Sequence, residues 1–371
     1  MTQPLTHSAR LGIVLSAQAN FYRVQLAVGD DDGLPQASLL CTCRALLKKT
    51  GQQVMVGDRV WVENLDWADE RAVINAIEPR RTQLDRPPVA NGDQVLLVFS
   101  LDEPALDAHQ LSRFLVKAEA TGMAVHLCLN KRDLVSHGHQ QAWQERLNQW
   151  GYHPILISVQ ADRTFPTLAP ILNRGITIIS GPSGVGKSSL INALIPATDL
   201  RTNRVSGKLR RGRHTTRHVE LFELPQGGLL ADTPGFNQPE IVCQPGQLGQ
   251  YFPEIRSRLE TGCCQFGDCL HRDEPGCIVR GDWDRYEHYT TILQECLTQQ
   301  QALQDSADPE AVYKAKVDSA GKIHHEPKLP TKKYRRVSRR RQQQALQDLR
   351  YELTGSTESL MNLEEQDWDT P

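Results

Sequence analysis

A glycine-rich stretch, ISGPSGVGKSSL at residues 179–190, has the residue types and spacing of a phosphate-binding loop. It satisfies the pattern G-x-x-x-x-G-K-[ST], in which backbone N–H groups surround phosphate oxygens, the lysine reaches the terminal phosphates and the hydroxyl binds Mg²⁺. The alternative, a glycine-rich turn without a ligand, is disfavoured because a strand is predicted before the loop and a helix after it. The pattern predicts contacts to nucleotide phosphates from Gly181, Pro182, Ser183, Gly184, Val185, Gly186, Lys187, Ser188 and Ser189, with Mg²⁺ on Ser188.

A second motif, N-K-R-D at residues 130–133, follows the predicted strand AVHLCLN and could identify the base. The Asp133 carboxylate can accept hydrogen bonds from the ring N1–H and the exocyclic amine of guanine, whereas adenine offers no such donor pair. The Lys131 stem would pack on the purine, and Asn130 would tie the loop to its neighbours. At the end of the strand HPILIS, Ser158 stands where GTPases place a small polar residue, although Val159 replaces the usual alanine. These residues favour GTP, with contacts from Asn130, Lys131, Arg132, Asp133 and Ser158.

The motif D-T-P-G at residues 232–235 ends another predicted strand, GGLLADT. Asp232 would hold Mg²⁺ through water, and the Gly235 N–H would sense the γ-phosphate. Either Thr215 or Thr216, in the segment GRHTT, can supply the Mg²⁺-binding threonine. The motif that identifies the base therefore comes before the phosphate loop, which is a circular permutation of the usual order. The permutation leads the two nucleotide-sensing segments directly into the C-terminal region.

Cysteine and histidine gather in CCQFGDCLHRDEPGC, residues 263–277. Three thiolates and one imidazole make a closed tetrahedral Zn²⁺ site of the structural type. Cys263 competes with Cys264 for one position, and a set of unligated cysteines is the alternative. The predicted zinc ligands are Cys264, Cys269, His271 and Cys277.

The order of predicted elements indicates a multi-domain chain. Five short strands with rough alternation in residues 1–80 predict a small β-barrel, with an OB-fold the leading candidate. The arginine- and proline-rich stretch PRRTQLDRPPVANGD that follows predicts a linker. Alternating strands and helices in residues 81–245 predict an α/β domain with a parallel sheet. Residues 246–305 predict a helical domain around the cysteine cluster, and residues 306–371 a charged, flexible tail.

Composition limits the class of protein. The chain has 371 residues, a net charge of −2 and nine cysteines. No signal peptide or long apolar run is apparent, so we expect a cytoplasmic protein without a membrane span, with its cysteines reduced. The basic segment KLPTKKYRRVSRRR at 328–341 precedes an acidic end. It is either a solvated tail or an extension that binds rRNA, so the small net charge does not argue against a polyanionic partner.

Together the barrel, the permuted motifs and the segment CCQFGDCLHRDEPGC resemble the RsgA (YjeQ) family of GTPases that depend on the small ribosomal subunit. The resemblance covers roughly residues 8–300. It implies an OB-fold, a GTPase domain and a zinc domain, and a GTPase that acts late in assembly of the 30S subunit. Its implied partners are GTP or GDP, the 30S subunit near the decoding region, and 16S rRNA. The oligomeric state stays open from the sequence, and nothing in it suggests other than a monomer.

Catalysis departs from the commonest GTPase pattern, because Phe236 follows the D-T-P-G motif where many GTPases have glutamine. The family resemblance implies that His214 orients the attacking water; the alternative is a solvated or phosphate-facing histidine. We expect slow hydrolysis until a partner orders this region. Two other functions stay open: an RNA-binding module for which GTP is only a locking ligand, and a small-metabolite kinase. The kinase is disfavoured because the N-K-R-D and D-T-P-G motifs have no role in that chemistry.

Overall fold

The computed structural model divides the chain into two compact units, residues 1–300 and 301–371. It describes residues 9–27, 37–44, 47, 51–85, 88–162, 164–195, 219–232, 241 and 243–305, and the backbone of two strands at 313–317 and 323–327. No helix in these ranges is long and apolar enough to cross a membrane.

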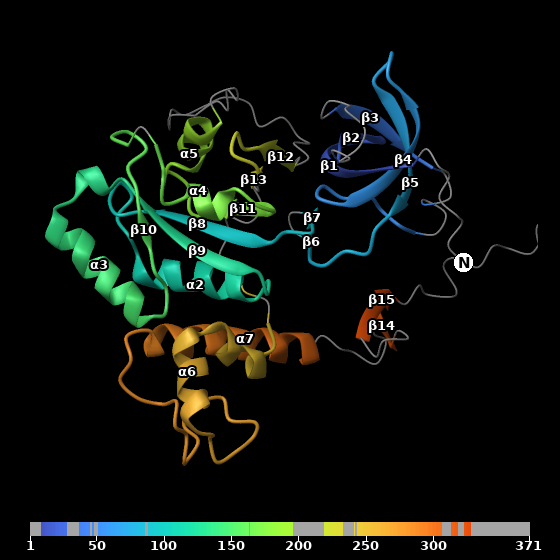
Figure 1. The fold of residues 1–371 in the computed structure, drawn as a ribbon. Helices are drawn as coiled ribbons and strands as arrows, with labels where there is room; N and C mark the ends of the chain where they lie inside the picture. Colours follow the sequence, from blue (N-terminus) through green and yellow to red (C-terminus); the bar gives the residue numbers. More distant parts are fainter. Residues whose placement is uncertain are drawn as a thin grey trace, which may run out of the picture. The chain divides into compact units, whose positions relative to one another are not determined.

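The N-terminal barrel has five strands, as the sequence predicts (Figure 1). Their order is β1-β2-β3-β5-β4, and β4 pairs back onto β1 to close the barrel. Alternate residues point inward, which is why the sequence alternates between apolar and polar positions. The interior is filled by side chains such as Val14, Val24, Leu39, Val60 and Ile74. The bounds are β1 Arg10–Gln18, β2 Phe21–Leu26, β3 Ser38–Cys43, β4 Arg59–Asp66 and β5 Arg71–Ile77.

A short hairpin joins the barrel to the next domain, where the sequence suggested only a linker. Its strands are β6 Gln83–Asp85 and β7 Pro88–Ala90. Behind it, the buried Asn91 side chain accepts from the Arg81 backbone N–H at 2.9 Å and donates to the Gly57 carbonyl at 3.0 Å. The connection is therefore held by buried hydrogen bonds.

The central domain is a sheet in the order β10-β9-β8-β11-β13-β12. All pairs are parallel except that of β12, which runs antiparallel to β13 and also pairs with β1 of the barrel at Ser16 and Glu220. Successive residues of β8 enter different cores, so this strand is apolar throughout. The strands are β8 Gln94–Ser100, β9 Ala124–Asn130, β10 Ile155–Leu156, β11 Ile176–Ser180, β12 Glu220–Glu223 and β13 Leu229–Asp232.

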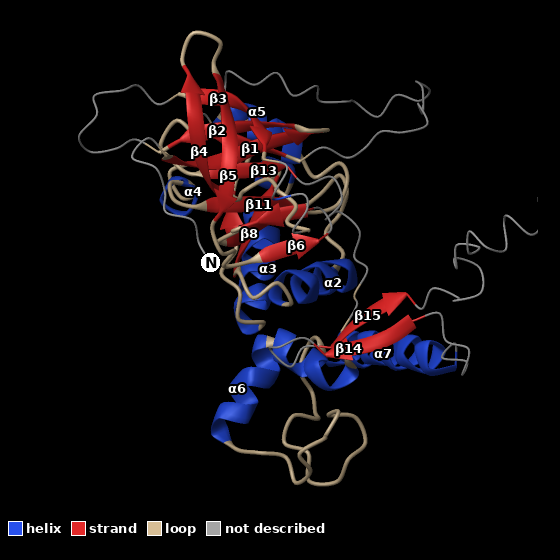
Figure 2. Ribbon diagram, turned by 90° about the vertical axis from the view of Figure 1, so that its right-hand side faces the viewer, coloured by secondary structure: helices blue, strands red, loops and turns tan. Residues whose placement is uncertain are grey.

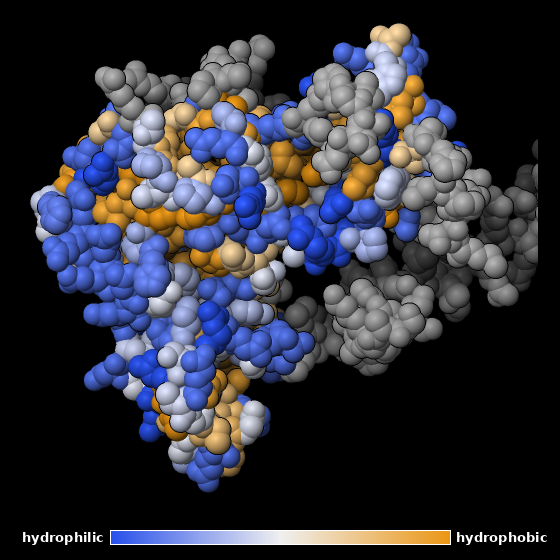
Figure 3. All heavy atoms as spheres, viewed as in Figure 1, coloured by the Kyte–Doolittle hydropathy of each residue, from blue (hydrophilic) through white to orange (hydrophobic). Residues whose placement is uncertain are grey.

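Helices cover both faces of this sheet (Figure 1). One core contains buried side chains of α2 and α3, and the other contains those of α4 and α5. Asp107 caps α2 by accepting from the Gln110 N–H, and Ser136 caps α3 in the same way at His139. In Figure 3 hydrophilic residues cover α3, while hydrophobic ones gather beside it toward α4. The helices are α2 Ala108–Glu119, α3 His137–Gln149, α4 Ala169–Leu172 and α5 Lys187–Leu194, with the 3-10 turn η1 Arg132–Leu134.

The C-terminal region is helical around an irregular cysteine-rich segment. Its core includes Val116 of α2, so it packs directly on the central domain. The helices are η2 Pro245–Tyr251, α6 Pro253–Thr261 and α7 Tyr286–Asp305. The segment predicted as a tail contains a hairpin, β14 Tyr313–Val317 and β15 Ile323–Pro327, drawn as paired strands in Figure 2. The basic stretch 328–341 and Phe236 lie outside the described residues.

Candidate nucleotide and metal sites

The predicted nucleotide motifs meet at one edge of the central sheet. Ser100 pairs with Asn130 at the ends of β8 and β9, and Ser180 ends β11 immediately before the phosphate loop. Asp232 pairs with Ile179, so it lies beside the start of that loop. The carboxyl ends of parallel strands are where open α/β sheets bind ligands.

The phosphate loop depends on glycine at two close approaches. A Cβ atom at Gly181, where φ is +143°, would lie 2.0 Å from the carbonyl oxygen of Val98. A Cβ atom at Gly186, where φ is +96°, would lie 2.4 Å from the Asn130 side-chain nitrogen. Both contacts exclude any larger residue, so the loop wraps tightly against β8 and β9. Gly186 then caps α5, whose first residue is Lys187.

Lys187 folds back over the loop that precedes it. Its ammonium donates to the carbonyls of Gly181 at 2.8 Å and Pro182 at 2.5 Å. Burial lowers the pKa of Lys187, and the nearby Asp232 carboxylate opposes that shift. Burial likewise raises the pKa of Asp232, opposed by Lys187. An anionic phosphate beside the ammonium would favour its charged form, because an opposite charge offsets the cost of burial.

Asn130 connects the loops that follow three different strands. Its side chain is 1% exposed. Its amide nitrogen donates to the Val185 carbonyl at 2.8 Å, and its amide oxygen accepts from the Val159 N–H at 3.2 Å. The predicted role of Asn130 in holding the loop to its neighbours therefore has a geometric basis.

The rest of the N-K-R-D motif is more open. Lys131 adopts a left-handed backbone conformation, and its ammonium donates to the Glu103 carbonyl. Arg132 and Asp133 are exposed. This arrangement leaves the Asp133 carboxylate accessible at the edge of the site, where a guanine would have to approach.

Two contacts to the predicted site residues could not be predicted from the sequence. The first is the β8–α2 loop, whose Glu103 holds Lys131 and whose Pro104 approaches Gly184. The second is Asp162, which accepts from Arg132 at 2.5 Å and from the Ser158 backbone N–H at 2.7 Å. The hydrogen bond from Arg132 lowers the pKa of Asp162. Neither residue belongs to a recognisable motif.

The Ser158 and Val159 backbone N–H groups, in the loop after β10, already have partners within the protein. The Ser158 N–H donates to Asp162, and the Val159 N–H donates to Asn130. The Ser158 hydroxyl accepts from the Ala161 N–H at 3.0 Å. A guanine carbonyl at this loop would therefore have to exchange one of these hydrogen bonds.

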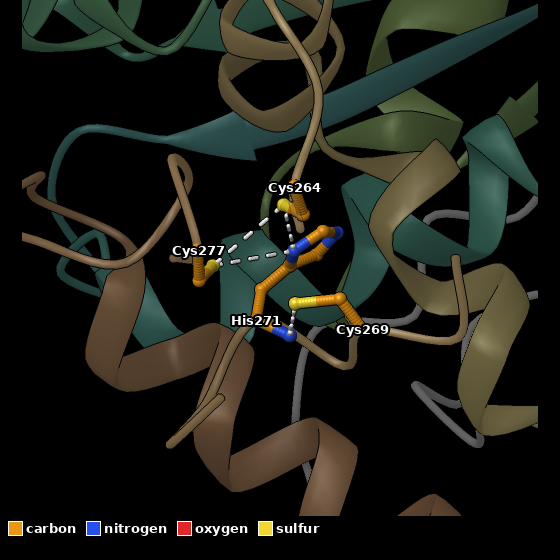
Figure 4. Close-up of side chains that lie close together, drawn as sticks. All are labelled: Cys264, Cys269, His271 and Cys277. Atoms are coloured by element: carbon orange, nitrogen blue, oxygen red, sulfur yellow. Dashed lines mark hydrogen bonds between the residues drawn. The ribbon is translucent and has the colours of Figure 1, made fainter. Parts of the chain in front are cut away.

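The cysteine-rich segment brings its four predicted ligands together (Figure 4). Their ligand atoms all lie within 4.8 Å of one another. The Cys264 and Cys277 sulfurs are 3.9 Å apart, and the His271 Nδ1 is 3.5 and 3.6 Å from them. A tetrahedron with metal–sulfur bonds of about 2.3 Å has edges of about 3.8 Å. The set therefore fits one tetrahedral ion, and the exposed Cys263 lies outside it.

Surrounding groups hold this segment in shape. Tyr286 donates to the His271 carbonyl at 3.0 Å, and Tyr289 donates to the Leu270 carbonyl at 2.7 Å. Glu274 accepts from the backbone N–H groups of Leu270 and Arg272. Burial alone would raise the pKa of Glu274, but these donors outweigh it and hold the pKa at about 2. The ligand loop is thus preorganised by hydrogen bonds to its backbone.

The remaining predicted site residues, His214, Thr215, Thr216 and Gly235, lie outside the described residues. Among the predicted Mg²⁺ ligands, Ser188 is the second residue of α5, next to Lys187, and Asp232 ends β13. Both are half-buried next to the phosphate loop.

Comparisons with known proteins agree with this arrangement. A family model described as RsgA GTPase matches residues 77–242. The small ribosomal subunit biogenesis GTPase RsgA of Trichormus variabilis is 57% identical over 356 residues, covering 91% of this chain and 96% of the relative. The protein of the same name from Synechocystis is 50% identical over 359 residues, covering 92% and 96%.

Two solved structures are also similar. YloQ, described as a circularly permuted GTPase, has a TM-score of 0.65 and 32% identity, and the match covers 79% of this chain and 96% of YloQ. YjeQ from Thermotoga maritima has a TM-score of 0.65 and 31% identity, covering 78% and 99%.

Proposed function

This chain belongs to the RsgA GTPase family, and on that premise we propose that it hydrolyses GTP to GDP and phosphate during maturation of the small ribosomal subunit. One observation carries the proposal: the buried Asn130 side chain joins the loop proposed to read guanine to the loop proposed to hold phosphates. Base recognition and phosphate binding are thereby parts of one rigid edge.

In the proposed site Asp133 accepts the two guanine donors, and Lys131 packs along the base. The loop from Gly181 to Ser189 holds the phosphates, with Lys187 leaving the carbonyls of Gly181 and Pro182 to bind phosphate oxygens. The other proposed GTP contacts are Arg132, Ser158 and Gly235. The movement of the Lys187 ammonium from the two carbonyls to the phosphates is favourable, because the half-buried ammonium gains a charged partner.

Mg²⁺ would be held by Ser188, Asp232 and either Thr215 or Thr216, and it would neutralise charge on the terminal phosphates. The half-buried carboxylate of Asp232, next to the phosphate loop, supports this assignment. Because burial raises the pKa of Asp232, a bound cation would favour its ionised form.

We propose His214 as the residue that orients the attacking water, since Phe236 follows the D-T-P-G motif and offers no hydrogen bond. Hydrolysis by the isolated chain should be slow, with stimulation by the 30S subunit. Positioning of a water and stabilisation of the transferred phosphoryl group are the main contributions that a partner can add.

The ion proposed for Cys264, Cys269, His271 and Cys277 is zinc, because three thiolates and an imidazole are soft ligands at tetrahedral spacing. Four protein ligands leave no position for a substrate. The ion would therefore supply folding energy to the C-terminal region and no catalytic step.

The proposed partners are GTP or GDP, the 30S subunit and its 16S rRNA. The curated relatives are named small ribosomal subunit biogenesis GTPases, and an OB-fold barrel is a common nucleic-acid-binding module. We further propose that the chain acts in the cytoplasm as a monomer.

The test is GTP turnover by the purified protein alone, with 30S subunits and with 50S subunits. We expect strong stimulation by 30S subunits only. Equal and feeble turnover in all three conditions would remove the ribosome-triggered activity and leave a GTP-dependent RNA-binding module.

Asp133→Asn is the matched variant for the base. The asparagine can donate a hydrogen bond where aspartate only accepts, so the preference should move from guanine to xanthine nucleotides, which carry a carbonyl in place of the exocyclic amine. Unchanged GTP turnover in this variant would contradict the assignment of Asp133.

A further inference from the structure

Two cysteines outside the proposed metal site touch each other. The Cys243 and Cys296 sulfurs are 3.4 Å apart and share a hydrogen bond. Cys243 is half-buried in the segment that leaves the central domain, eight residues after Gly235, and Cys296 is 1% exposed on α7. Their proximity joins points 53 residues apart in the chain.

The surroundings of this pair are mainly apolar. Both cysteines belong to the core of the C-terminal region, with Ile241, Ile292 and Leu293. Neither lies among the four residues of the metal cluster. Thiols in contact can react with each other once one of them is oxidised.

We propose that Cys243 and Cys296 form a reversible disulfide, and that this pair is a site of redox modification in the protein. The oxidant is of the peroxide class, and it meets Cys243 first because Cys243 is half-buried whereas Cys296 is 1% exposed. The distance between the two sulfurs must fall from 3.4 Å to about 2 Å, a change that side-chain rotation can supply.

The reaction has two balanced steps. Hydrogen peroxide transfers an oxygen to the Cys243 thiol, which becomes a sulfenic acid, and the peroxide is reduced to water. The Cys296 sulfur then attacks the Cys243 sulfur; the new S–S bond forms, the S–O bond breaks, and the hydroxide leaves with the Cys296 proton as a second water. The hydrogen bond between the two thiols lowers the pKa of Cys296 and raises that of Cys243. Exposure, not acidity, therefore makes Cys243 the first sulfur to be oxidised, and the more readily ionised Cys296 suits the role of second nucleophile.

The position of the bond gives it a consequence. The closed loop from residue 243 to residue 296 contains α6 and all four proposed zinc ligands. A cross-link around a long loop restricts the unfolded chain more than the folded one. The oxidised protein should therefore keep its C-terminal fold under conditions that remove the metal.

The direct test uses full-length, metal-loaded protein treated with increasing amounts of hydrogen peroxide. Remaining thiols are blocked with N-ethylmaleimide, and the protein is digested without reductant for mass spectrometry. The expected product is a peptide pair joining Cys243 to Cys296, lighter by two hydrogens than the sum and separated by dithiothreitol. A metallochromic dye in the same samples should register zinc release only at higher peroxide.

Two outcomes would overturn the proposal. In the first, N-ethylmaleimide modifies both Cys243 and Cys296 in samples in which peroxide has already released the zinc, so the pair has stayed reduced while the metal ligands were oxidised. In the second, Cys243 carries irreversible sulfinic acid without any cross-link to Cys296.

A second measurement does not rely on the peptide map. In the presence of a chelator, the unfolding midpoint of oxidised wild-type protein should lie a few degrees above that of reduced protein. Cys243→Ser should abolish the difference, and Cys263→Ser, which changes an exposed cysteine outside the pair, should retain it. An equal midpoint for oxidised and reduced wild-type protein would contradict the proposed stabilisation of the C-terminal region by the disulfide.

Discussion

The side-chain amide of Asn130 donates to the Val185 carbonyl at 2.8 Å, across 55 positions of sequence. Its oxygen accepts from Val159 at the end of the neighbouring strand. The same side chain stands so close to Gly186 that a Cβ atom there would collide with it. The phosphate loop and the proposed base-reading loops are therefore held in fixed relative positions before any ligand arrives.

Asn130→Ala should weaken GDP binding. It leaves the buried Val185 carbonyl and the half-buried Val159 N–H without their partners, at a cost of about 1–3 kcal/mol, or roughly 5- to 150-fold in affinity if the loops loosen in the free protein. Titration with a fluorescent GDP analogue measures the change.

Asn173→Ala is the matched control, because Asn173 is exposed in the same domain and follows α4. It should bind GDP as the wild type does. A thermal unfolding curve of Asn130→Ala separates lost affinity from lost fold. Wild-type affinity in a folded Asn130→Ala protein would show that the tether is unimportant for the nucleotide.

Adjacent cysteines provide a sharp test of the metal site. Cys264→Ser should lose the ion, since Cys264 lies within 3.9 Å of the Cys277 sulfur, whereas Cys263→Ser should keep it. Elemental analysis of the purified proteins should give one zinc per chain for the wild type and for Cys263→Ser. The reverse pattern would assign the ligand to Cys263.

The sequence predicts well whatever depends on short-range pattern. The phosphate loop, N-K-R-D and D-T-P-G each follow an apolar strand, and parallel strands necessarily bring their carboxyl ends to one edge. Cysteine spacing likewise predicts the metal cluster, though only the structure separates Cys264 from Cys263. The alternation of apolar and polar residues predicts the number of barrel strands, but it does not predict their order in the sheet.

What the sequence misses depends on long-range contacts. Strand β12 has four residues and exists because β13 and β1 flank it. The hairpin β6–β7 contains arginine and proline, which are typical of a linker. Asp162 and Glu103 look like ordinary loop residues, and their roles appear only when Arg132 and Lys131 reach them.

Arg285 was also not predictable as a core residue, because DWDRYEH reads as an exposed segment. Its side chain is 0% exposed, between Phe252 and Trp150. It donates to Glu254 of α6 at 3.2 Å and to Ser112 of α2 at 3.1 Å. Burial raises the pKa of Glu254 although Arg285 opposes the shift, so desolvation outweighs the attraction here.

Removing only Glu254 from its buried pair with Arg285 should therefore lower the free energy of unfolding more than replacing both residues. Glu254→Ala should lower the free energy of unfolding by about 3–5 kcal/mol, because a buried guanidinium loses its counter-charge. The double variant Glu254→Leu with Arg285→Met should recover most of that loss. Urea unfolding at neutral pH measures both, and a double variant as unstable as the single one would contradict this account.

Asp284 gives a pH dependence with a defined sign. It accepts from Arg146 at 2.5 and 2.9 Å and from the Trp150 indole at 2.7 Å, which joins α3 to the segment before α7. The hydrogen bond from Arg146 is the main cause that lowers the pKa of Asp284, with burial opposing it. A carboxyl whose pKa is lowered in the folded state stabilises the fold at pH values above its unfolded pKa of about 3.9, and this stabilisation is lost as the pH falls through the folded pKa.

Asp284→Asn should therefore be less stable than the wild type by a constant amount from about pH 7 to pH 5, and the difference should shrink below about pH 4. Asp282→Asn, an exposed change two residues away, should show little difference at any pH. Thermal unfolding of the three proteins across this range makes the comparison, since acid release of the metal is common to all of them. A difference that grows as the pH falls would reverse the sign and exclude the ionised Asp284 as a stabilising group.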